Sequence, residues 1–168
     1  MKKIVVFLVA IFASVASLSA QNYMVVDSEK VFKSIAEYNT ALSELETLSA
    51  SYQKSVDAKF EEVESLYSTY MSRRTSLTEA QRSAYESQIL EKESEANEYQ
   101  ESLFSNDGSL MERRIELISP IQTKVFAAIE NYAKANGFDL VLDLASNATV
   151  LYKSDKIDRT EAVIAYLK

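Results

Sequence analysis

The residue types that most often carry catalysis and metal binding are missing from this sequence of 168 residues. It contains no cysteine and no histidine. Without cysteine there is no disulfide, no thiolate zinc site and no thiol chemistry; without histidine the commonest general base and transition-metal ligand is lost. No glycine-rich phosphate loop or nucleophile elbow occurs either. We therefore expect that the protein is not an enzyme and uses no cofactor or metal.

Among the chemical groups that remain, two clusters of charged side chains stand out. Six glutamates lie between Glu86 and Glu101, with Lys92 as the one basic residue among them. A calcium site of the EF-hand type would need a spacing and a glycine that are absent here, so we interpret this stretch as a solvated helix face. A second cluster is either a solvated turn or a contact for acidic lipid headgroups or polypeptide segments. Its members are Arg73, Arg74 and Arg82, with Glu79.

The first twenty residues predict a secretory signal peptide. Lys2 and Lys3 precede an apolar run over residues 4–15, and a Ser/Ala stretch ends at Ala20. The run is short for a membrane span, so cleavage after Ser19 or Ala20 is favoured over an uncleaved anchor, and the protein is expected to be exported. Removing both lysines leaves 16 Lys/Arg against 25 Asp/Glu, a net charge of −9. Such an acidic chain is a poor partner for nucleic acid.

A long helical hairpin is the main element that the sequence predicts. No glycine or proline occurs between residues 21 and 107. At alternating steps of four and three from Val31 to Tyr70, ten of twelve positions are apolar or tyrosine, the exceptions being Ser49 and Lys59. This pattern predicts one long helix with a heptad seam. Thr78 and Gln81 have the spacing of a capping box, so a returning helix is expected to begin there. Its seam is Tyr85, Ile89, Lys92, Ala96, Tyr99 and Leu103.

The two helices are expected to pair side by side. A turn between them places Lys59 near Glu95, and Lys54 near Glu98 and Glu101. The other glutamates of the returning helix repel one another at spacings of three and four residues. We therefore expect a hairpin that is marginally stable and flexible toward its turn.

The rest of the chain predicts a small unit of strands and helices. Asn106-Asp107-Gly108 is expected to interrupt the returning helix. Ser119-Pro120 is expected to start a helix, and Asn136-Gly137 is expected to end it. Alternating apolar residues predict short strands, and a periodic run predicts a last helix. The strands are expected at residues 23–27, 138–144 and 149–152, and the helix at residues 160–167.

These elements predict an α+β fold in which a small β-sheet body carries a long antiparallel coiled-coil hairpin. The expected boundaries are a signal peptide at 1–20, a body at 21–35 and 119–168, and a hairpin arm at 36–118 with its tip near 73–82. Three short strands leave open sheet edges that pair readily with another chain, so the body is expected to oligomerise, with a copy number that these patterns leave open. The residues expected at that contact are Tyr23, Val25, Phe138, Leu140, Leu142, Val150 and Tyr152.

Three segments resemble the Skp/OmpH family of periplasmic chaperones: residues 23–32, residues 118–125, and residues 137–143 followed by 152–158. The resemblance implies a homotrimer whose bodies join in a β-sheet core while three arms extend like tentacles. It also implies that unfolded outer-membrane proteins are held between the arms, in the periplasm and without ATP. One departure is charge: the best-known member is basic, whereas residues 39–118 here carry 8 Lys/Arg against 16 Asp/Glu.

Aromatic and methionine side chains of the arm are the candidate client-binding residues. Most of the seam is expected to form the hairpin core, and side chains that do not fit a two-helix seam would face the client, where they suit weak and unspecific binding. The candidates are Tyr38, Tyr52, Phe60, Tyr67, Tyr70, Met71, Tyr85, Tyr99 and Phe104. The alternative function is a periplasmic coiled-coil scaffold or spacer, which accounts for the arm but has no need for a thin, tyrosine-rich seam.

Overall fold

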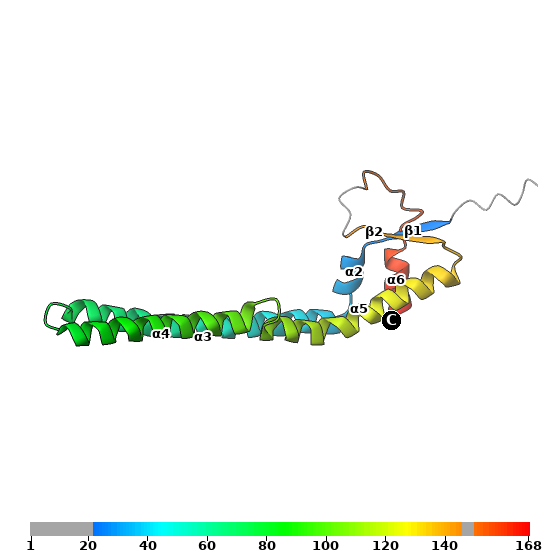
Figure 1. Cartoon of the computed structure of the whole chain (residues 1–168). Helices are drawn as coiled ribbons and strands as arrows, with labels where there is room; N and C mark the ends of the chain where they lie inside the picture. The colour runs from blue at the N-terminus through cyan, green and yellow to red at the C-terminus, as the bar shows by residue number, and fades with distance from the viewer. Residues whose placement is uncertain (1–21, 146–149) are drawn as a thin grey trace, which may run out of the picture. The chain divides into compact units, whose positions relative to one another are not determined.

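The computed structural model describes residues 22–145 and 150–168, and Figure 1 gives the order of their helices and strands. The chain divides into two compact units. The helical unit comprises residues 35–123, and the sheet unit comprises the described residues of 22–34 and 124–168. The expected signal peptide lies outside the described residues. Across the ranges that are described, no helix combines the length and the apolar character needed to cross a membrane.

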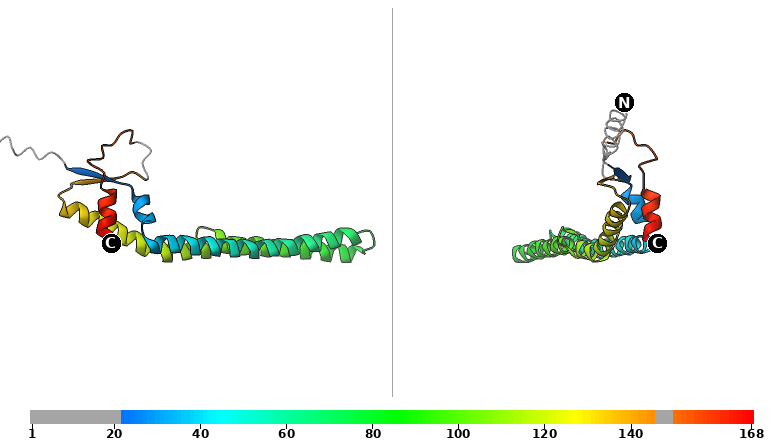
Figure 2. Two further views of the ribbon diagram at one scale, coloured as in Figure 1. Left: turned by 180° about the vertical axis from the view of Figure 1, so that it is seen from behind. Right: turned by 90° about the vertical axis from the view of Figure 1, so that its right-hand side faces the viewer.

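The helical unit is built on an antiparallel hairpin of α3 (Ala36–Arg73) and α4 (Glu79–Phe104), which run side by side in the views of Figure 2. The predicted capping box starts α4: the Gln81 N–H donates to the Thr78 hydroxyl at 3.3 Å, and the Thr78 N–H donates to the Gln81 side-chain oxygen at 2.9 Å. Every predicted seam residue of α4 is buried or half-buried. The returning helix and its inward face are therefore confirmed.

The first helix begins later than the apolar spacing predicts. A separate short helix, α2 (Ser28–Lys33), is capped by Asp27, whose carboxylate accepts from the Lys30 N–H at 3.0 Å. Ile35 then adopts an extended backbone, with φ of −94° and ψ of 122°, and this breaks the helix before α3. The predicted continuity from Val31 is wrong. The seam also shifts at its start, because Leu42 is exposed while its neighbour Ala41 is buried.

The returning helix of the hairpin is interrupted after α4, as predicted. Residues 105–108 separate α4 from α5 (Ser109–Ala135), and the Gly108 N–H donates to the Ser105 carbonyl at 3.0 Å. The predicted helix start at Ser119-Pro120 is wrong, since Pro120 lies inside α5. A proline there removes one helical hydrogen bond to the carbonyl of Glu116. Glu116 and Pro120 are both exposed, so the missing hydrogen bond lies on the exposed face of α5.

The sheet unit holds a parallel pair of strands, β1 (Tyr23–Val26) and β2 (Leu140–Asp143), drawn next to each other in Figure 1. On its other side β1 pairs with residues 157–159, where the Val25 N–H donates to the Ile157 carbonyl at 2.9 Å. The predicted strand over 149–152 is wrong in its described part: residues 150–152 are irregular, and Thr149 lies outside the described residues. The coarse prediction of a small sheet attached to long helices is confirmed.

Helix ends and apolar packing complete the sheet unit. α5 stops at a Schellman motif in which Gly137 has φ of 67° and the Phe138 N–H donates to the Ala133 carbonyl at 3.0 Å, as Asn136-Gly137 predicted. α6 (Thr160–Leu167) spans the predicted residues. The fully buried core draws one or two side chains from each of β1, α2, α5 and α6. These are Met24, Val26, Val31, Val125 and Val163.

Two carboxylates hold the sheet unit together, one between segments distant in sequence and one within the segment before α6. Asp143, at the end of β2, accepts hydrogen bonds from the Ser28 N–H at 3.1 Å and the Ser28 hydroxyl at 2.7 Å. Asp158 accepts from the Thr160 hydroxyl at 2.6 Å and forms a salt bridge with Lys153. Partial burial raises the pKa of Asp158, but the hydrogen bonds from Lys153 and Thr160 outweigh it and lower the pKa to about 2. The Asp27 N–H in turn donates to the Thr160 hydroxyl at 3.0 Å, so Asp158 orients a side chain that contacts the segment after β1.

Candidate functional site

Aromatic side chains meet across the α3–α4 hairpin at three levels. One level is an edge-to-face pair of rings, one is a lysine over a ring and one is a stacked pair near the turn. The edge-to-face pair is Tyr52 and Phe104, with ring centroids 6.3 Å apart. The Lys59 amine lies 5.0 Å from the centroid of the Tyr99 ring. The stacked pair is Tyr70 and Tyr85, with centroids 5.8 Å apart. Such contacts fix the pairing of the two helices.

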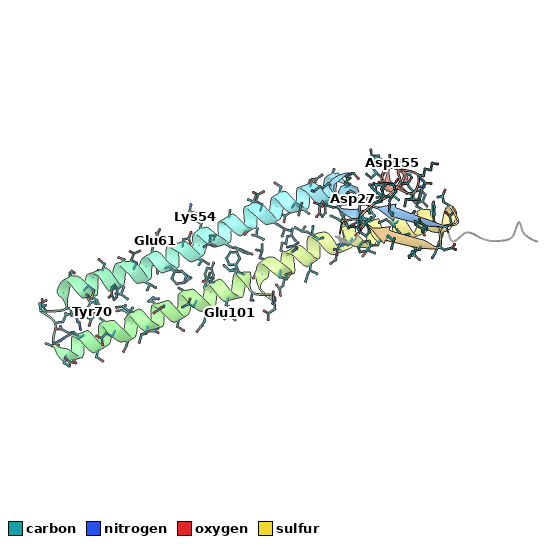
Figure 3. The ribbon with its side chains drawn as sticks, turned by 90° about the horizontal axis from the view of Figure 1, so that it is seen from above. Asp27, Lys54, Glu61, Tyr70, Glu101 and Asp155 are labelled. Carbon is teal, nitrogen blue, oxygen red and sulfur yellow. The ribbon has the colours of Figure 1, made fainter. Side chains whose placement is uncertain are left out.

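The predicted ion pairs of the hairpin are only partly formed. Lys59 lies close enough to Glu95 to help lower its pKa, although the hydrogen bond from Lys92 is the larger cause. This part of the predicted pairing is confirmed. Lys54 and Glu101 instead point away from the opposite helix (Figure 3), and in the described ranges no salt bridge joins Lys54 to a glutamate. Both are exposed, so their charges are solvated rather than paired.

Tyr70 anchors the hairpin beside its turn, where Figure 3 shows it between the two helices. The side chain is buried and its hydroxyl donates to the Glu86 carboxylate at 2.5 Å. This hydrogen bond, followed by burial and by the negative charge of Glu86, raises the pKa of the Tyr70 phenol, while Arg74 acts in the opposite direction. Tyr70 is thus a fixed part of the hairpin core.

The structure places the nine candidate side chains of the arm in two sets. Tyr67 and Met71 are exposed, at 51% and 47% of their possible surface. The other seven are buried or half-buried. They are Tyr38, Tyr52, Phe60, Tyr70, Tyr85, Tyr99 and Phe104.

Three exposed aliphatic residues of the helical unit were missed by the aromatic selection. Leu42, Leu90 and Ile115 are exposed at 40%, 66% and 56%. Leu90 directly follows the seam residue Ile89, so an apolar residue one step outside the heptad was the available signal. Leu42 carried no such signal, because it occupied a predicted seam position.

An apolar groove lies between α3 and α4 next to the turn, and we call it the tip groove. Its volume is about 460 Å³. The exposed apolar side chains form its walls, Tyr70 lies at its base, and Arg74 and Glu86 provide its charges. The lining residues are Tyr67, Tyr70, Met71, Arg74, Glu86, Ile89 and Leu90.

The three arginines predicted at the tip have different surroundings. Arg82 forms a salt bridge with Glu79 at 3.5 Å, and its Nε atom is buried without a hydrogen-bond partner. Arg73 and Arg74 are exposed, and within the described ranges neither forms a salt bridge. Arg73 and Arg74 are thus the tip arginines outside salt bridges, and Arg74 also interacts with the Tyr70 hydroxyl.

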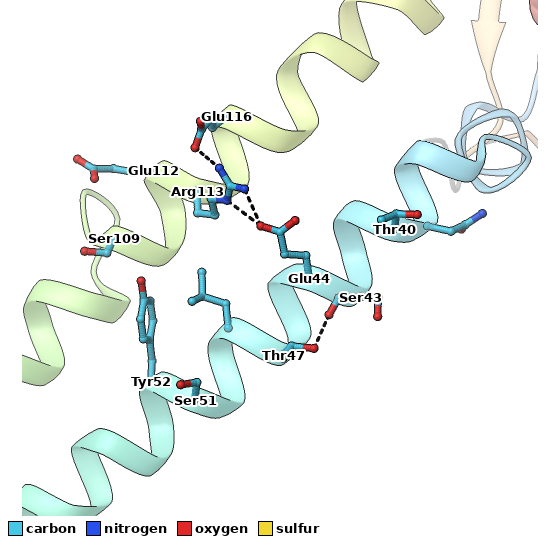
Figure 4. Close-up of a pocket in the computed structure, with 12 residues that line it drawn as sticks. Thr40, Ser43, Glu44, Thr47, Ser51, Tyr52, Ser109, Glu112, Arg113 and Glu116 are labelled. Carbon is cyan, nitrogen blue, oxygen red and sulfur yellow. Dashed lines mark hydrogen bonds and ion pairs between the residues drawn. The ribbon is translucent and has the colours of Figure 1, made fainter.

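A larger groove, of about 1160 Å³, lies between the start of α3 and the start of α5, and we call it the root groove (Figure 4). Arg113 reaches across it from α5: Nη2 lies 2.6 Å from a carboxylate oxygen of Glu44, and Nη1 lies 2.5 Å from Glu116. The hydrogen bonds to Glu44 and Glu116 raise the pKa of Arg113. Hydroxyl groups of α3, including those of Thr47 and Ser51, line the opposite wall. Most residues along this groove have polar side chains, and its central cation, Arg113, already pairs with two carboxylates.

The two units differ sharply in charge. Residues 35–123 contain 8 Lys/Arg and 17 Asp/Glu, whereas residues 22–34 and 124–168 together contain 8 of each. The helical unit therefore carries a net charge of −9 and the sheet unit is neutral. No group of three or more potential metal-binding side chains occurs in the ranges that the structure describes.

The sheet unit exposes apolar residues along and beyond β2. Tyr23, Leu140 and Leu142 are 46%, 53% and 37% exposed, and Tyr152 is 85% exposed in the irregular segment. Of the other predicted contact residues, Val150 is also exposed, Phe138 is half-buried against Tyr132, and Val25 is buried inside the unit. The Val25 side chain is therefore unavailable to a partner, because it packs within its own chain.

Comparison with known proteins completes the description of the site. The model of the family described as "Outer membrane protein (OmpH-like)" matches residues 22–167. Among solved structures, the chain is similar to a candidate outer membrane chaperone (OmpH-like) from Caulobacter crescentus, with a TM-score of 0.65 and 14% identity over 89% of this chain and 85% of that one. A search of curated protein sequences finds no match. Since the family model spans both units, as the sequence resemblance predicted, the chain belongs to the OmpH-like family.

Proposed function

We propose that this protein is an ATP-independent holdase chaperone of the periplasm, which binds unfolded outer-membrane proteins and prevents their aggregation. The observation that carries the proposal is the set of large apolar side chains exposed on an otherwise acidic helical unit. Membership of the OmpH-like family and the similarity to a candidate outer membrane chaperone support it. The exposed side chains are Leu42, Tyr67, Met71, Leu90 and Ile115.

The proposed mechanism relies on many weak contacts. An unfolded barrel protein presents alternating apolar strands that aggregate when they meet one another. Separate apolar side chains on a helical surface bury part of those strands without demanding one geometry, and several such contacts acting together retain the client. The charge of −9 on the helical unit would keep loaded complexes apart. Release without ATP requires a competing process, such as insertion or folding of the barrel.

The proposed assembly is a homotrimer joined through the sheet unit, so that three helical units surround one client. Its support is the β2 edge, which is unpaired among the described residues and lies close to exposed apolar side chains such as Leu140. A two-stranded sheet of four-residue strands is a small structure with open edges that favour pairing with another chain. Leu151 and Tyr152 are the most exposed of these residues and are proposed to lie at the contact.

Native mass spectrometry of the chain without residues 1–20 tests the proposal, alone and after addition of a urea-denatured outer-membrane barrel protein. We expect three copies alone and three copies with one client after mixing. Light scattering should show that the protein suppresses aggregation of the diluted client without ATP. A folded soluble protein is the control and should not bind. A scaffold or spacer would instead bind folded partners and leave client aggregation unchanged, which would refute the holdase function.

A further inference from the structure

The tip groove carries an inference about which segments of a client bind, and this inference rests on the proposed holdase function. Its walls are apolar and open to solvent, since Tyr67, Met71 and Leu90 are each about half exposed or more. Among the described residues nothing covers them. Adjacent exposed apolar side chains on two helices form a patch of the kind that marks an interaction site.

The base of the groove is fixed before any ligand arrives. Tyr70 is buried, stacks on Tyr85 with ring planes 28° apart, and donates its hydroxyl hydrogen to Glu86 at 2.5 Å. These contacts tie α3 to α4 at the level of the groove. A preformed site binds more tightly because less conformational entropy is lost when the ligand enters.

The charges along the groove are unequal at its two ends. Arg74 lies at the end nearest the turn, next to Arg73, and neither is in a salt bridge within the described ranges. Glu86, which also lines the groove, already accepts a hydrogen bond from the Tyr70 hydroxyl. Beyond Leu90, away from the turn, α4 continues with Glu91 and Glu93, both exposed. An occupant with complementary charge therefore carries an anion at the turn end and no anion at the other end.

The dimensions favour a polypeptide segment over a membrane surface. A volume of about 460 Å³ lies within the range of about 300–1,000 Å³ typical of ligand pockets, enough for a few side chains. An anionic bilayer that reached Arg74 would bring its headgroups toward the acidic continuation of α4, where like charges repel. A short segment with one carboxylate avoids that repulsion.

We infer that the tip groove binds apolar segments of unfolded clients that carry an acidic residue directly beside the apolar side chains. The apolar side chains lie against Tyr67, Met71 and Leu90, and the carboxylate lies against Arg74. The groove thus gives an acidic helical unit a place where apolar residues and an acidic residue of a client are accepted together. It sets a preference among client segments, in addition to the unspecific apolar binding of the rest of the surface.

Two fluorescent peptides of equal length and apolar content test the inference by anisotropy with the chain lacking residues 1–20. One has Asp beside its apolar residues and the other has Lys there. We expect the Asp peptide to bind about two- to fivefold more tightly, as for an exposed ion pair. Arg74→Gln should abolish this difference, whereas Arg114→Gln, at another exposed arginine of the helical unit, should preserve it. Replacing Met71 and Leu90 by serine should weaken the binding of both peptides by the same factor.

Equal binding of the two peptides, or the same loss with Arg114→Gln, would overturn the inference. The holdase function would survive that outcome if the protein still suppressed aggregation of a denatured barrel protein, so the two failures are distinguishable. Vesicles of anionic and neutral lipid test the earlier prediction of lipid contact at the tip. Salt-sensitive binding to anionic vesicles that is lost in Arg74→Gln, without any peptide preference, would assign Arg74 to lipid and refute the peptide site.

Discussion

The Asp158→Asn substitution gives the sharpest prediction for the stability of the sheet unit. The Asp158 carboxylate accepts from the Thr160 N–H at 2.9 Å and the Thr160 hydroxyl at 2.6 Å, and it pairs with Lys153. Asparagine keeps an acceptor for Thr160 but loses the charge that Lys153 stabilises. The substitution therefore removes mainly the electrostatic part of the contact.

The magnitude follows from the pKa, which falls from 3.8 to about 2 on folding. At neutral pH this shift corresponds to about 2 kcal/mol of folding free energy. The side chain is 22% exposed, so screening by solvent reduces the expected loss in Asp158→Asn to about 1–2 kcal/mol. A group whose pKa is lowered on folding contributes its full stability above the unfolded pKa and loses it as pH falls. The difference between the two proteins should therefore shrink between about pH 4 and pH 2.

Urea unfolding followed by circular dichroism measures this difference, at several pH values and at one fixed protein concentration because the protein is proposed to oligomerise. Asp155→Asn is the matched control, since Asp155 is exposed in the same segment, accepts no hydrogen bond among the described residues and acts on Lys153 only through its charge. It should change stability little. A loss in Asp158→Asn that is as large at pH 2 as at pH 7 would refute the electrostatic reasoning. Equal stability at pH 7 would refute it as well.

Further substitutions test the break between α4 and α5, the end of α5, the hairpin core and the sheet-unit core. Gly108→Ala should cost about 1–3 kcal/mol in thermal unfolding, because its Cβ would lie 2.8 Å from a backbone carbon. Gly137→Ala meets no atom within 4 Å but must keep φ of 67°, so we expect a smaller cost of about 1 kcal/mol, and the reverse order would contradict this assignment. Glu86→Gln should return the pKa of Tyr70 toward its usual value. The measurement is a pH titration of tyrosinate absorbance, in which Tyr70→Phe identifies the contribution of Tyr70. An unchanged titration would exclude the hydrogen bond to Glu86 as the cause. Val163→Ala, at a fully buried position, should lower stability by about 2 kcal/mol, and a negligible change would show that its packing is loose.

The fold was predictable where a local interaction decides the backbone. Thr78 and Gln81 satisfy each other's backbone donors, so their spacing was enough to place the start of α4. The end of α5 at Gly137 was equally predictable, because the left-handed backbone conformation that follows a helix strongly favours glycine. The prediction of a helix start at Pro120 was wrong, because proline at a helix start and proline on the exposed face of a continuous helix can have the same local sequence.

Tertiary pairing was harder to predict than local structure. The strand expected at 149–152 has the right composition, but β1 pairs instead with the segment around Asp158, whose polar residues carry no strand pattern. No groove was predicted at the tip, although some of the residues that line it were candidates. Tyr67 and Met71 were among the candidates, whereas Leu90 was not, since the amount of exposed surface depends on how α3 and α4 are rotated about their axes.

The exposed apolar surface of the helical unit follows from the geometry of a two-helix seam. Several of its buried side chains are small, namely Ala41, Val56 and Ala96, and small residues let two helices approach closely. A close pair of helices has little interior volume, so large rings such as Tyr99 are displaced to its margins, where Lys59 covers one face. Residues further around each helix remain in solvent unless a third surface covers them. The surplus negative charge of this unit opposes contact between two such surfaces by like-charge repulsion. Under the proposed holdase function, an unfolded client is therefore the third surface.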